Sequence, residues 1–276
     1  MNILVVYKKS KYEIYRYVND TQQYVNSDSE HARKMRQSHE VQKASIEKVY
    51  DVLEKMGVNF EAVYRADLRT IKNKDLVLSL GGDGTFLEVS HYLTDIPIMG
   101  VNTDSENSTG YFCCCDAESF ERTINEFEKL PRQKVNRLEV QLDNVILEPA
   151  LNDVFFGHPC PAAVSRYDLN SEKHKDSGVL MCTAIGSTAW MYQENGIVMS
   201  IDSFEIQYKV RGKRNALPEF AAELKLTSFT REGRIYIDGE HLNYECGLGS
   251  KLIIRNGMPL TIMGDVKSKR KEYLHN

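Results

Sequence analysis

The sequence lacks the features that mark membrane, zinc and nucleic-acid-binding proteins. Its longest apolar runs are far shorter than the roughly 20 residues that a membrane-spanning helix needs, so we expect no membrane contact. Lys and Arg number 35 against 39 Asp and Glu, a formal charge of −4, which excludes a global basic field for nucleic acid. The six cysteines form no Cys-x-x-Cys pair, so we expect reduced thiols and assign no metal ligands.

Targeting signals and repeats are also missing. Residues 1–7 read directly as a strand, without a charged leader, long apolar segment or small-residue cleavage site before them. We therefore expect a cytoplasmic protein. No internal repeat or low-complexity segment occurs, and 276 residues with 42% hydrophobic content are enough for one large or two ordinary domains.

Two common phosphate-binding signatures are absent, and a different glycine-rich turn is present. Neither Gly-x-x-x-x-Gly-Lys-Ser/Thr nor Gly-x-Gly-x-x-Gly occurs, which excludes a P-loop and the usual dinucleotide fingerprint. Residues 81–85 instead read Gly-Gly-Asp-Gly-Thr. They follow the apolar run 76–80, typical of a buried strand, and precede apolar residues at helical spacing.

This turn suits an anion that reacts. Its glycines, Gly82 and Gly84 among them, can take backbone angles closed to other residues and let backbone N–H groups approach a ligand. Thr85 can cap the following helix, whose N-terminus favours a phosphate. A carboxylate in the middle, Asp83, would repel a phosphate that only had to be bound. Asp83 therefore accepts a proton, holds a metal ion, or does both; a tight turn without chemistry is the alternative.

Helical and strand patterns alternate over the first half of the chain. We expect strands at 1–7, 58–64, 76–80 and 96–102, helices at 31–56, 86–93 and 119–130, and a polar loop at 19–30. This order favours a mainly parallel sheet with helices on both faces.

The pattern changes at Pro131. From Val135 to Asp265, short alternating strands are separated by turn signals such as Asp143-Asn144 and Asn256-Gly257. We therefore predict an α/β domain over residues 1–130, a β-rich, sandwich-like domain over 131–265, and a charged C-terminal tail over 266–276.

Polar residues at three further places are candidates for ligand binding. Lys8, Lys9 and Lys11 follow the first strand, at the end where open α/β sheets bind ligands, although solvated surface lysines fit as well. Asn152 and Asp153 can together hold a vicinal diol, or else form an Asx turn. Small residues between Thr183 and Trp190 allow a flat ligand to approach, or else pack a turn over the core.

Taken together, these residues resemble the NAD kinase family over nearly the whole chain. The motifs that carry the resemblance are Gly-Gly-Asp-Gly-Thr at 81–85, Asn152-Asp153, Thr-x-x-Gly-Ser-Thr-Ala-aromatic at 183–190, and Asp238-Gly239. The opening strand, the long segment 100–110 and the total length look most like the branch of mitochondrial and plant NAD(H) kinases.

The resemblance implies a reaction and a role for each matching residue. ATP would give its γ-phosphoryl group to the 2′-hydroxyl of the adenosine ribose of NAD or NADH, with Mg²⁺ or another divalent cation. Asp83 would be the general base, Gly84 and its neighbours would cradle phosphates, and Asn152 and Asp153 would hold ribose hydroxyls. Asp176 would lie near the nicotinamide end. Thr188, Ala189, Trp190 and Gln193 would line the nucleotide pocket. Tyr111 and Phe112 match the family's aromatic positions after the glycine of the loop that follows the fourth strand.

The chain departs from the family pattern at three places. Residues 103–109 replace the usual short glycine-rich loop, Trp190 stands for a common tyrosine, and Glu240 stands where many members carry glutamine. The resemblance also implies a homo-oligomer, a dimer or tetramer, that contacts itself through the β-rich domain. It leaves open the choice between NAD and NADH and between ATP and polyphosphate.

Two other functions compete with the kinase. A lipid kinase of the diacylglycerol or sphingosine type has a similar glycine-rich turn. Such an enzyme needs an apolar channel for the acyl chain, and the polar Asn152-Asp153 pair argues against one. The second competing function is a non-catalytic dinucleotide sensor with the same fold. The intact Asp83 argues against a sensor.

Overall fold

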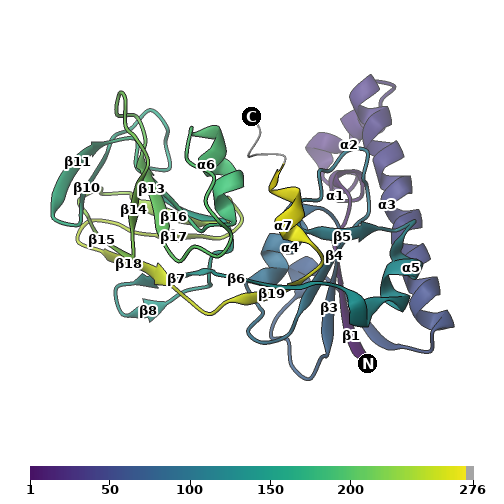
Figure 1. Ribbon diagram of the computed structural model, residues 1–276. Helices are drawn as coiled ribbons and strands as arrows, with labels where there is room; N and C mark the ends of the chain where they lie inside the picture. Colours follow the sequence, from purple (N-terminus) through teal and green to yellow (C-terminus); the bar gives the residue numbers. More distant parts are fainter. Residues whose placement is uncertain (272–276) are drawn as a thin grey trace. The chain divides into compact units, whose positions relative to one another are not determined.

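The computed structural model describes residues 1–271, which divide between two units (Figure 1). The first unit consists of Met1–Gln133 and Thr261–Lys269, and the second consists of Lys134–Leu260 with Arg270 and Lys271. The sequence predicts the boundary at residues 130–131 and places residues 261–265 in the β-rich domain. The difference arises because the chain returns to the first unit over Thr261–Lys269 and enters the second unit again at Arg270.

The first unit is built on a mainly parallel sheet, as expected. The strand order is β2-β1-β3-β4-β19-β6, with β5 paired to β4, and the pairs β1–β2, β1–β3, β3–β4, β4–β5 and β4–β19 are parallel. The strands are β1 (Asn2–Tyr7), β2 (Asn59–Tyr64), β3 (Leu76–Leu80), β4 (Ile98–Asn102), β5 (Cys113–Asp116), β6 (Arg132–Val135) and β19 (Leu260–Met263). All of β3 and β4 is buried. Because the two strands pair in parallel, the residues that follow them lie at the same end of the sheet.

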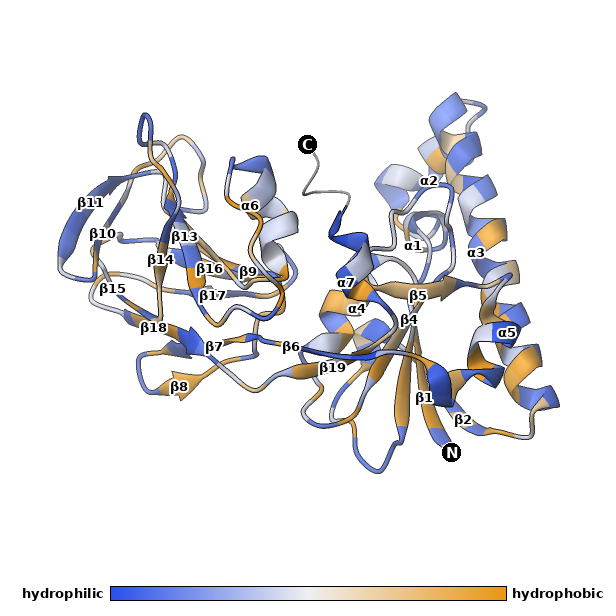
Figure 2. Ribbon diagram, in the orientation of Figure 1, coloured by the Kyte–Doolittle hydropathy of each residue, from blue (hydrophilic) through white to orange (hydrophobic). Residues whose placement is uncertain are grey.

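Helices cover both faces of this sheet (Figure 1). They are α1 (Lys11–Tyr15), α2 (Asn19–Val25), α3 (Glu30–Lys55), α4 (Asp83–Ser90), α5 (Phe120–Asn125) and α7 (Val266–Lys269), with 3₁₀ turns at Arg65–Asp67 and Phe127–Lys129. Residues of α3 and α5 share a core with β1, β3 and β4, while α4 lies on the opposite side in Figure 1. The central strands are mostly hydrophobic, whereas α3 has both hydrophilic and hydrophobic residues along its length (Figure 2), as expected for a helix packed on a buried sheet.

The longest helix, α3, has the ends that the sequence predicts. The Ser29 side chain accepts a hydrogen bond from the Ala32 N–H at the start, and Gly57 takes the left-handed conformation, φ +64°, at the end. None of the described helices has the length and hydropathy to cross a bilayer.

The loop expected at residues 19–30 is wrong, because Asn19–Val25 forms helix α2. Val25 is fully buried, and Arg36 of α3 donates hydrogen bonds to the Val25 and Ser27 carbonyls at 2.6 and 3.0 Å. Packing against α3 therefore overrides the polar local sequence.

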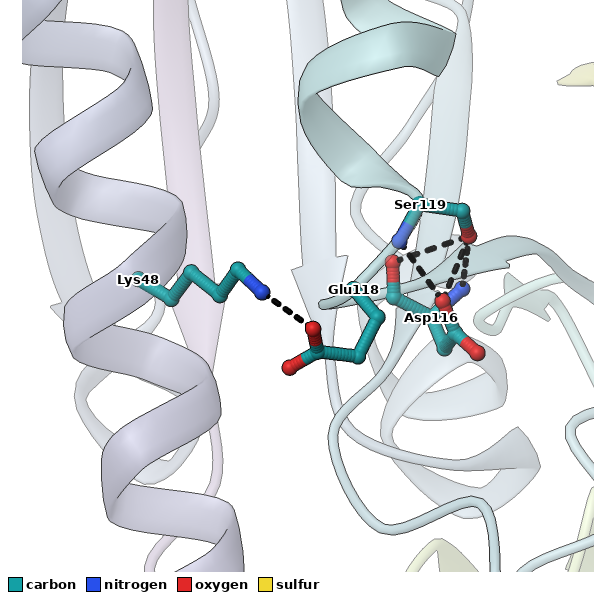
Figure 3. A network of polar contacts seen from close by, with 4 residues as sticks. All are labelled: Lys48, Asp116, Glu118 and Ser119. Carbon is teal, nitrogen blue, oxygen red and sulfur yellow. Dashed lines mark hydrogen bonds and ion pairs between the residues drawn. The ribbon is translucent and has the colours of Figure 1, made fainter.

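A polar network fixes the start of α5 (Figure 3). The Asp116 carboxylate accepts a hydrogen bond from the Ser119 N–H at 2.9 Å and another from its hydroxyl, and these bonds lower the pKa of Asp116. Glu118 forms an ion pair with Lys48 of α3. The two helices on this face of the sheet are thus joined by charge as well as by the core.

The second unit consists of two antiparallel sheets that share one core. One sheet has the order β11-β10-β15-β18-β7-β8 and the other β14-β13-β12-β9-β16-β17. Buried residues of both sheets, such as Val140, Phe156 and Ile254, form a single cluster, which confirms the predicted sandwich-like domain. The bounds are β7 (Leu138–Leu142), β8 (Val145–Ile146), β9 (Asp153–Gly157), β10 (Ser165–Leu169), β11 (Glu172–Asp176), β12 (Val179–Cys182), β13 (Ile206–Val210), β14 (Glu219–Ala221), β15 (Glu223–Ser228), β16 (Arg234–Ile237), β17 (Asn243–Glu245), β18 (Lys251–Asn256), a 3₁₀ turn at Gly186–Thr188 and helix α6 (Trp190–Gln193).

The predicted charged tail is partly built into the fold. Lys269 donates hydrogen bonds to the carbonyls of Gly110, Tyr111 and Cys113 in the first unit, and Arg270 is only 4% exposed. The rest of that prediction, residues 272–276, lies outside the described residues.

Candidate functional site

The glycine turn joins β3 directly to α4. The helix begins at Asp83 with Gly82 as its N-cap, so the prediction that Thr85 caps the helix is wrong. Thr85 is the third helical residue, buried, and its hydroxyl has no hydrogen-bond partner among residues 1–271. The carboxylate therefore lies in the first turn of a helix, beside the N–H groups that have no acceptor within the helix.

Glycine is required at 81 and 82 because other side chains occupy the space beside them. A Cβ on Gly81 would lie 2.5 Å from the Thr85 hydroxyl oxygen, and one on Gly82 would overlap the Ser108 hydroxyl oxygen. Neither residue has a positive φ, so the expected special backbone angles are not the reason. On the side of Gly81 and Gly82, protein side chains fill the space next to the turn.

Gly84 differs from these two glycines. It is exposed, its φ is not positive, and no atom lies within 4 Å of a Cβ built on it. The protein itself thus gives no reason for glycine here. The missing side chain leaves the helix N-terminus open next to Asp83, as a bound phosphate requires.

A backbone group orients the Asp83 carboxylate. The Phe112 N–H donates a hydrogen bond to Oδ1 at 2.8 Å. Phe112 is held by stacking on Phe86 of α4, with ring centroids 4.9 Å apart, and Tyr111 packs edge-on against it. The Phe112 ring is 3% exposed, so it supports the site through its amide and its packing.

The long segment after β4 is anchored by Asp104, a residue that the sequence analysis missed. Its carboxylate accepts hydrogen bonds from Ser38 of α3 at 2.5 Å and from the Asn107 amide at 2.9 Å, and Asn102 holds the Ser108 carbonyl at 2.9 Å. These bonds fix the segment that places Ser108 against the turn. An Asn-x-Asp sequence directly after a buried strand was the available signal.

Of the three N-terminal lysines, Lys8 is the one beside the turn. Tyr7 pairs with Leu80 in register, so the residues that follow them are neighbours, and Lys8 Cδ would lie 3.4 Å from a Cβ on Gly81. Burial lowers the pKa of Lys8, and the Asp104 charge opposes this shift. Lys9 instead stacks on Tyr64, 4.4 Å from its ring centroid, and Lys11 is exposed at the start of α1.

In the second unit, Asp238 holds the loop that carries Asn152. Its carboxylate accepts hydrogen bonds from the N–H groups of Leu151, Asn152 and Asp153 at 2.7, 2.7 and 3.0 Å. Asp238 and Gly239 both have positive φ values, +51° and +118°, so the late Asp-Gly motif forms the hairpin turn between β16 and β17 and also fixes this loop.

The Asn152 and Asp153 side chains are both buried, but they differ in hydrogen bonding and charge. Asn152 is 9% exposed and its Oδ1 has no hydrogen-bond partner in the described chain. Burial, together with the charge of Asp238, raises the pKa of Asp153 to about 8. Asp153 is therefore mainly a neutral acid at pH 7, which can donate one hydrogen bond as well as accept. An unpaired buried oxygen beside a neutral acid suits a ligand hydroxyl.

Thr183 and Gly186 bring the small-residue turn onto the same loop. The Thr183 hydroxyl donates to the Leu151 carbonyl at 2.7 Å and accepts from the Gly186 N–H at 2.9 Å. A Cβ on Gly186 would overlap the Asn152 backbone. Arg270 fixes the other side, donating hydrogen bonds to the Ala184, Ile185 and Met199 carbonyls. No sequence pattern indicated that role for Arg270.

Trp190 follows this turn and lines a cavity of about 620 Å³ in the second unit. Phe155 and Tyr236 supply further aromatic walls, and the Arg211 guanidinium lies 5.0 Å from the Trp190 ring and 5.4 Å from that of Phe155. Glu240 also lines the cavity. Of the four residues predicted to line a nucleotide pocket, Thr188 and Ala189 are half-buried and Gln193 is exposed, and none of these three lines this cavity.

Asp176 is not brought to this cavity. Its side chain is 6% exposed, and Oδ1 accepts hydrogen bonds from the Tyr167 hydroxyl at 3.0 Å and the Gly178 N–H at 2.8 Å. The His174 ring lies 3.5 Å from Oδ2. Within this chain its contacts support the end of β11.

Comparison with known proteins assigns the chain to a family. A sequence model of the ATP-NAD kinase N-terminal domain matches residues 5–130. A probable NADH kinase of Oryza sativa subsp. japonica is 32% identical over 260 residues, which cover 80% of each chain. The chain belongs to the NAD kinase family. Other NAD kinase family members include NAD kinase 2, mitochondrial, of Homo sapiens, 26% identical over 71% of this chain and 58% of the human protein. The expected likeness to plant and mitochondrial members is confirmed.

Solved structures of NAD kinase family members have the same fold. Yeast NADH kinase complexed with NADH matches 96% of this chain and 83% of its own, with a TM-score of 0.72 and 15% identity. An NAD kinase from Archaeoglobus fulgidus in complex with ATP matches 99% of this chain and 97% of its own, with a TM-score of 0.70 and 18% identity. The two-domain NAD kinase fold that the sequence predicts is thereby confirmed.

Proposed function

We propose that this protein is an NAD(H) kinase that transfers the γ-phosphoryl group of ATP to the 2′-hydroxyl of the adenosine ribose of NAD or NADH. The observation that carries the proposal is Asp83, a carboxylate oriented by the Phe112 N–H in the first turn of a helix, next to the open backbone of Gly84. A site that only bound phosphate would gain nothing from a negative charge there.

Asp83 acts as the general base in this mechanism. Oδ1 is held by the Phe112 N–H, and Oδ2 takes the proton of the ribose hydroxyl as its oxygen bonds to the γ-phosphorus. The bond from that phosphorus to the bridging oxygen breaks at the same time, and ADP leaves with the electron pair. Such proton transfer contributes about 10²–10⁴-fold in rate.

Positive groups around the turn hold the phosphates in line. The first N–H groups of α4, exposed at Gly84, and the Lys8 ammonium beside Gly81 supply this charge. Among residues 1–271 no group of three or more His, Cys, Asp or Glu could hold a metal ion. Mg²⁺ would be held mainly by the phosphates of ATP, and Asp83 would be the carboxylate available to it. When bound, the ion neutralises charge on those phosphates.

The second unit binds the dinucleotide in this proposal. The unpaired Oδ1 of Asn152 accepts a hydrogen bond from a ribose hydroxyl, and Asp153 holds the neighbouring hydroxyl. The aromatic cavity at Trp190 takes a flat ring of NAD(H), while Thr188, Ala189 and Gln193 contact the nucleotide beside it. Asp176 contributes at the nicotinamide end only by holding the end of β11.

The test compares wild type with Asp83→Asn, which keeps the shape but cannot take a proton. NADP formation is measured with Mg²⁺-ATP and NAD or NADH, using an NADP-specific dehydrogenase. We expect a loss of at least 10²-fold in kcat, with unchanged melting temperature and NAD binding. Asp95→Asn, an exposed carboxylate in the segment between α4 and β4, serves as control. Near-normal turnover by Asp83→Asn would sink the assigned role, and NAD binding without phosphoryl transfer by wild type would favour the sensor.

Three finer assignments belong to the same proposal. We propose ATP as the donor, with polyphosphate as the replacement to test, a homodimer or tetramer through the second unit, and a cytoplasmic location. Donor competition, sedimentation of the purified protein and fluorescence microscopy of a tagged chain test them separately.

A further inference from the structure

The last residue of helix α7, Lys269, is bound to the loop that precedes strand β5. The side chain is half-buried. Its Nζ donates hydrogen bonds to three backbone carbonyls, at 3.0 Å to Gly110, 3.0 Å to Tyr111 and 2.6 Å to Cys113. An ammonium group has three N–H donors and no acceptor, so these carbonyls match its donors one for one. Lys269 thus places a positive charge against one short turn of backbone.

One of these carbonyls belongs to the peptide group that holds the Asp83 carboxylate. The Tyr111 C=O and the Phe112 N–H are the two polar ends of a single trans peptide, which is planar, so they point in opposite directions. Lys269 binds the C=O end at 3.0 Å, and Asp83 Oδ1 accepts from the N–H end at 2.8 Å. Rotation of this peptide would break both bonds together. The ammonium group therefore fixes the direction in which the N–H points.

The charge of Lys269 also acts on Asp83 through this peptide. A cation bound to the C=O makes the N–H of the same peptide a stronger donor, because hydrogen bonds in a chain polarise one another. Both ends of this chain are charged, an ammonium group and a carboxylate, and hydrogen bonds to charged groups are the stronger kind. Stacking on Phe86 fixes the Phe112 ring, whereas Lys269 fixes the polar ends of the peptide before it.

The backbone that carries Lys269 is held on both sides. The Asp265 carboxylate accepts a hydrogen bond from the Ser268 N–H at 2.9 Å, and Val266 is buried. The next residue, Arg270, is 4% exposed and donates hydrogen bonds to carbonyls of the second unit. The ammonium group therefore extends from a fixed segment to the loop.

We propose that Lys269 is a positioning residue for the phosphoryl transfer, which holds the Tyr111–Phe112 peptide so that its N–H keeps the Asp83 carboxylate oriented toward the hydroxyl that it deprotonates. This inference rests on the proposed function, since Asp83 is the general base of that reaction. Lys269 itself contacts neither substrate in the proposal. Its loss should therefore lower kcat and leave the KM values for ATP and NAD nearly unchanged.

Substitutions at Lys269 test this division between kcat and KM. Lys269→Met removes the charge and the donors but keeps an unbranched side chain, and we expect kcat to fall about ten- to 100-fold, because a misplacement of about 1 Å can cost 10²-fold. Lys269→Arg keeps the charge and N–H donors and should recover most of this loss. Lys271→Met, which removes the charge of an exposed lysine two residues later, is the control and should match wild type. Unchanged kcat in folded Lys269→Met overturns the inference.

Nuclear magnetic resonance of protein labelled with [¹⁵N]phenylalanine reports the hydrogen bond without requiring turnover. The Phe112 amide signal is assigned by its loss in Phe112→Tyr. We expect its proton shift to move upfield, as a weakened hydrogen bond requires, in both Asp83→Asn and Lys269→Met, and to stay in place in Lys271→Met. If Lys269→Met does not fold, Lys269→Gln, which keeps an NH₂ group without the charge, supplies the same measurement.

The two readouts separate this inference from the proposed function. A Phe112 signal that stays in place or moves downfield in the folded Lys269 variant overturns the inference, whatever the activity. A signal that moves upfield in a protein that forms no NADP supports the positioning of Asp83 by Lys269 and rejects the proposed kinase. The two failures are therefore distinguishable.

Discussion

Asp238 accepts a hydrogen bond from the backbone N–H of Asn152, with 2.7 Å between Oδ1 and the nitrogen. The same carboxylate accepts from the N–H groups on either side, at Leu151 and Asp153. A residue from the end of β16 thus fixes three consecutive amides about 85 residues earlier in the chain. The Asp-Gly motif positions the Asn-Asp motif.

Asp238→Asn should weaken this loop. The amide has one acceptor oxygen in place of two, and its NH₂ group faces N–H donors, so about 2–4 kcal/mol of stability is lost. We expect a lower melting temperature by calorimetry and a raised KM for NAD, with kcat changed less. Asp95→Asn should melt as wild type does. An unchanged melting temperature in Asp238→Asn contradicts the anchoring role.

The buried acid at position 153 should make stability depend on pH. The pKa of Asp153 is about 8 in the folded protein against about 3.9 in an unfolded chain. Between these values the folded state binds more protons than the unfolded state, so this group's contribution to stability falls as pH rises from 4 to 8. We expect Asp153→Asn to be more stable than wild type by a few kcal/mol at pH 8 and by much less at pH 4. Urea unfolding at both pH values measures the difference, and an equal gain at both would refute the raised pKa.

Gly84→Ala should separate stability from activity. The added methyl group meets no protein atom within 4 Å, and Ala is about 1 kcal/mol better than Gly inside a helix, so the melting temperature should hold or rise. Because the methyl group occupies the side from which a phosphate approaches, we expect turnover to fall about 10²-fold.

Gly82→Ala should behave differently. Its Cβ would overlap the Ser108 hydroxyl, so we expect a loss of stability of about 1–3 kcal/mol. Adding Ser108→Gly removes the overlap and should restore the melting temperature. Full activity of Gly84→Ala, or failure of this rescue, would count against the two different reasons assigned to the two glycines.

Arg270→Met should destabilise the second unit. Arg270 is 4% exposed and its guanidinium donates to three carbonyls and to the Ser187 hydroxyl. Leaving those carbonyls unpaired costs about 2–4 kcal/mol. Lys271→Met, the exposed neighbour, is the control and should change the melting temperature little. Equal melting of both variants would mean that the turn after Thr183 is held by other contacts.

Local patterns in the sequence were sufficient where structure is local. The strand, turn and helix over residues 76–90 and the long helix α3 follow from apolar spacing and end signals, and the motifs at Asp83 and Asn152 were recognisable in the sequence. Helix α2 was missed because its stability comes from burial of Val25 against another helix. Strand β5 contains the three adjacent cysteines, and its sequence has no alternation of polar and apolar residues that would predict a strand.

Long-range relationships could not be predicted in the same way. Lys8, Lys9 and Lys11 are equivalent in the sequence, and the register of β1 against β3 distinguishes them. The contacts of Asp238 and Arg270 join segments more than 70 residues apart, and no spacing encodes them. Asp176 has the right residue type, but its contacts within this chain are with Tyr167 and Gly178.

The return of β19 to the parallel sheet affects how the protein is made. The strand that pairs with β4 is Leu260–Met263, and a ribosome adds these residues only after the whole β-sandwich has been synthesised. Since chains are built from the N-terminus at about 5–20 residues per second, β4 waits for its neighbour for roughly 10–30 seconds. The unit that carries the glycine turn is thus begun first, but one of its sheet strands is added only after all strands of the second unit have been synthesised.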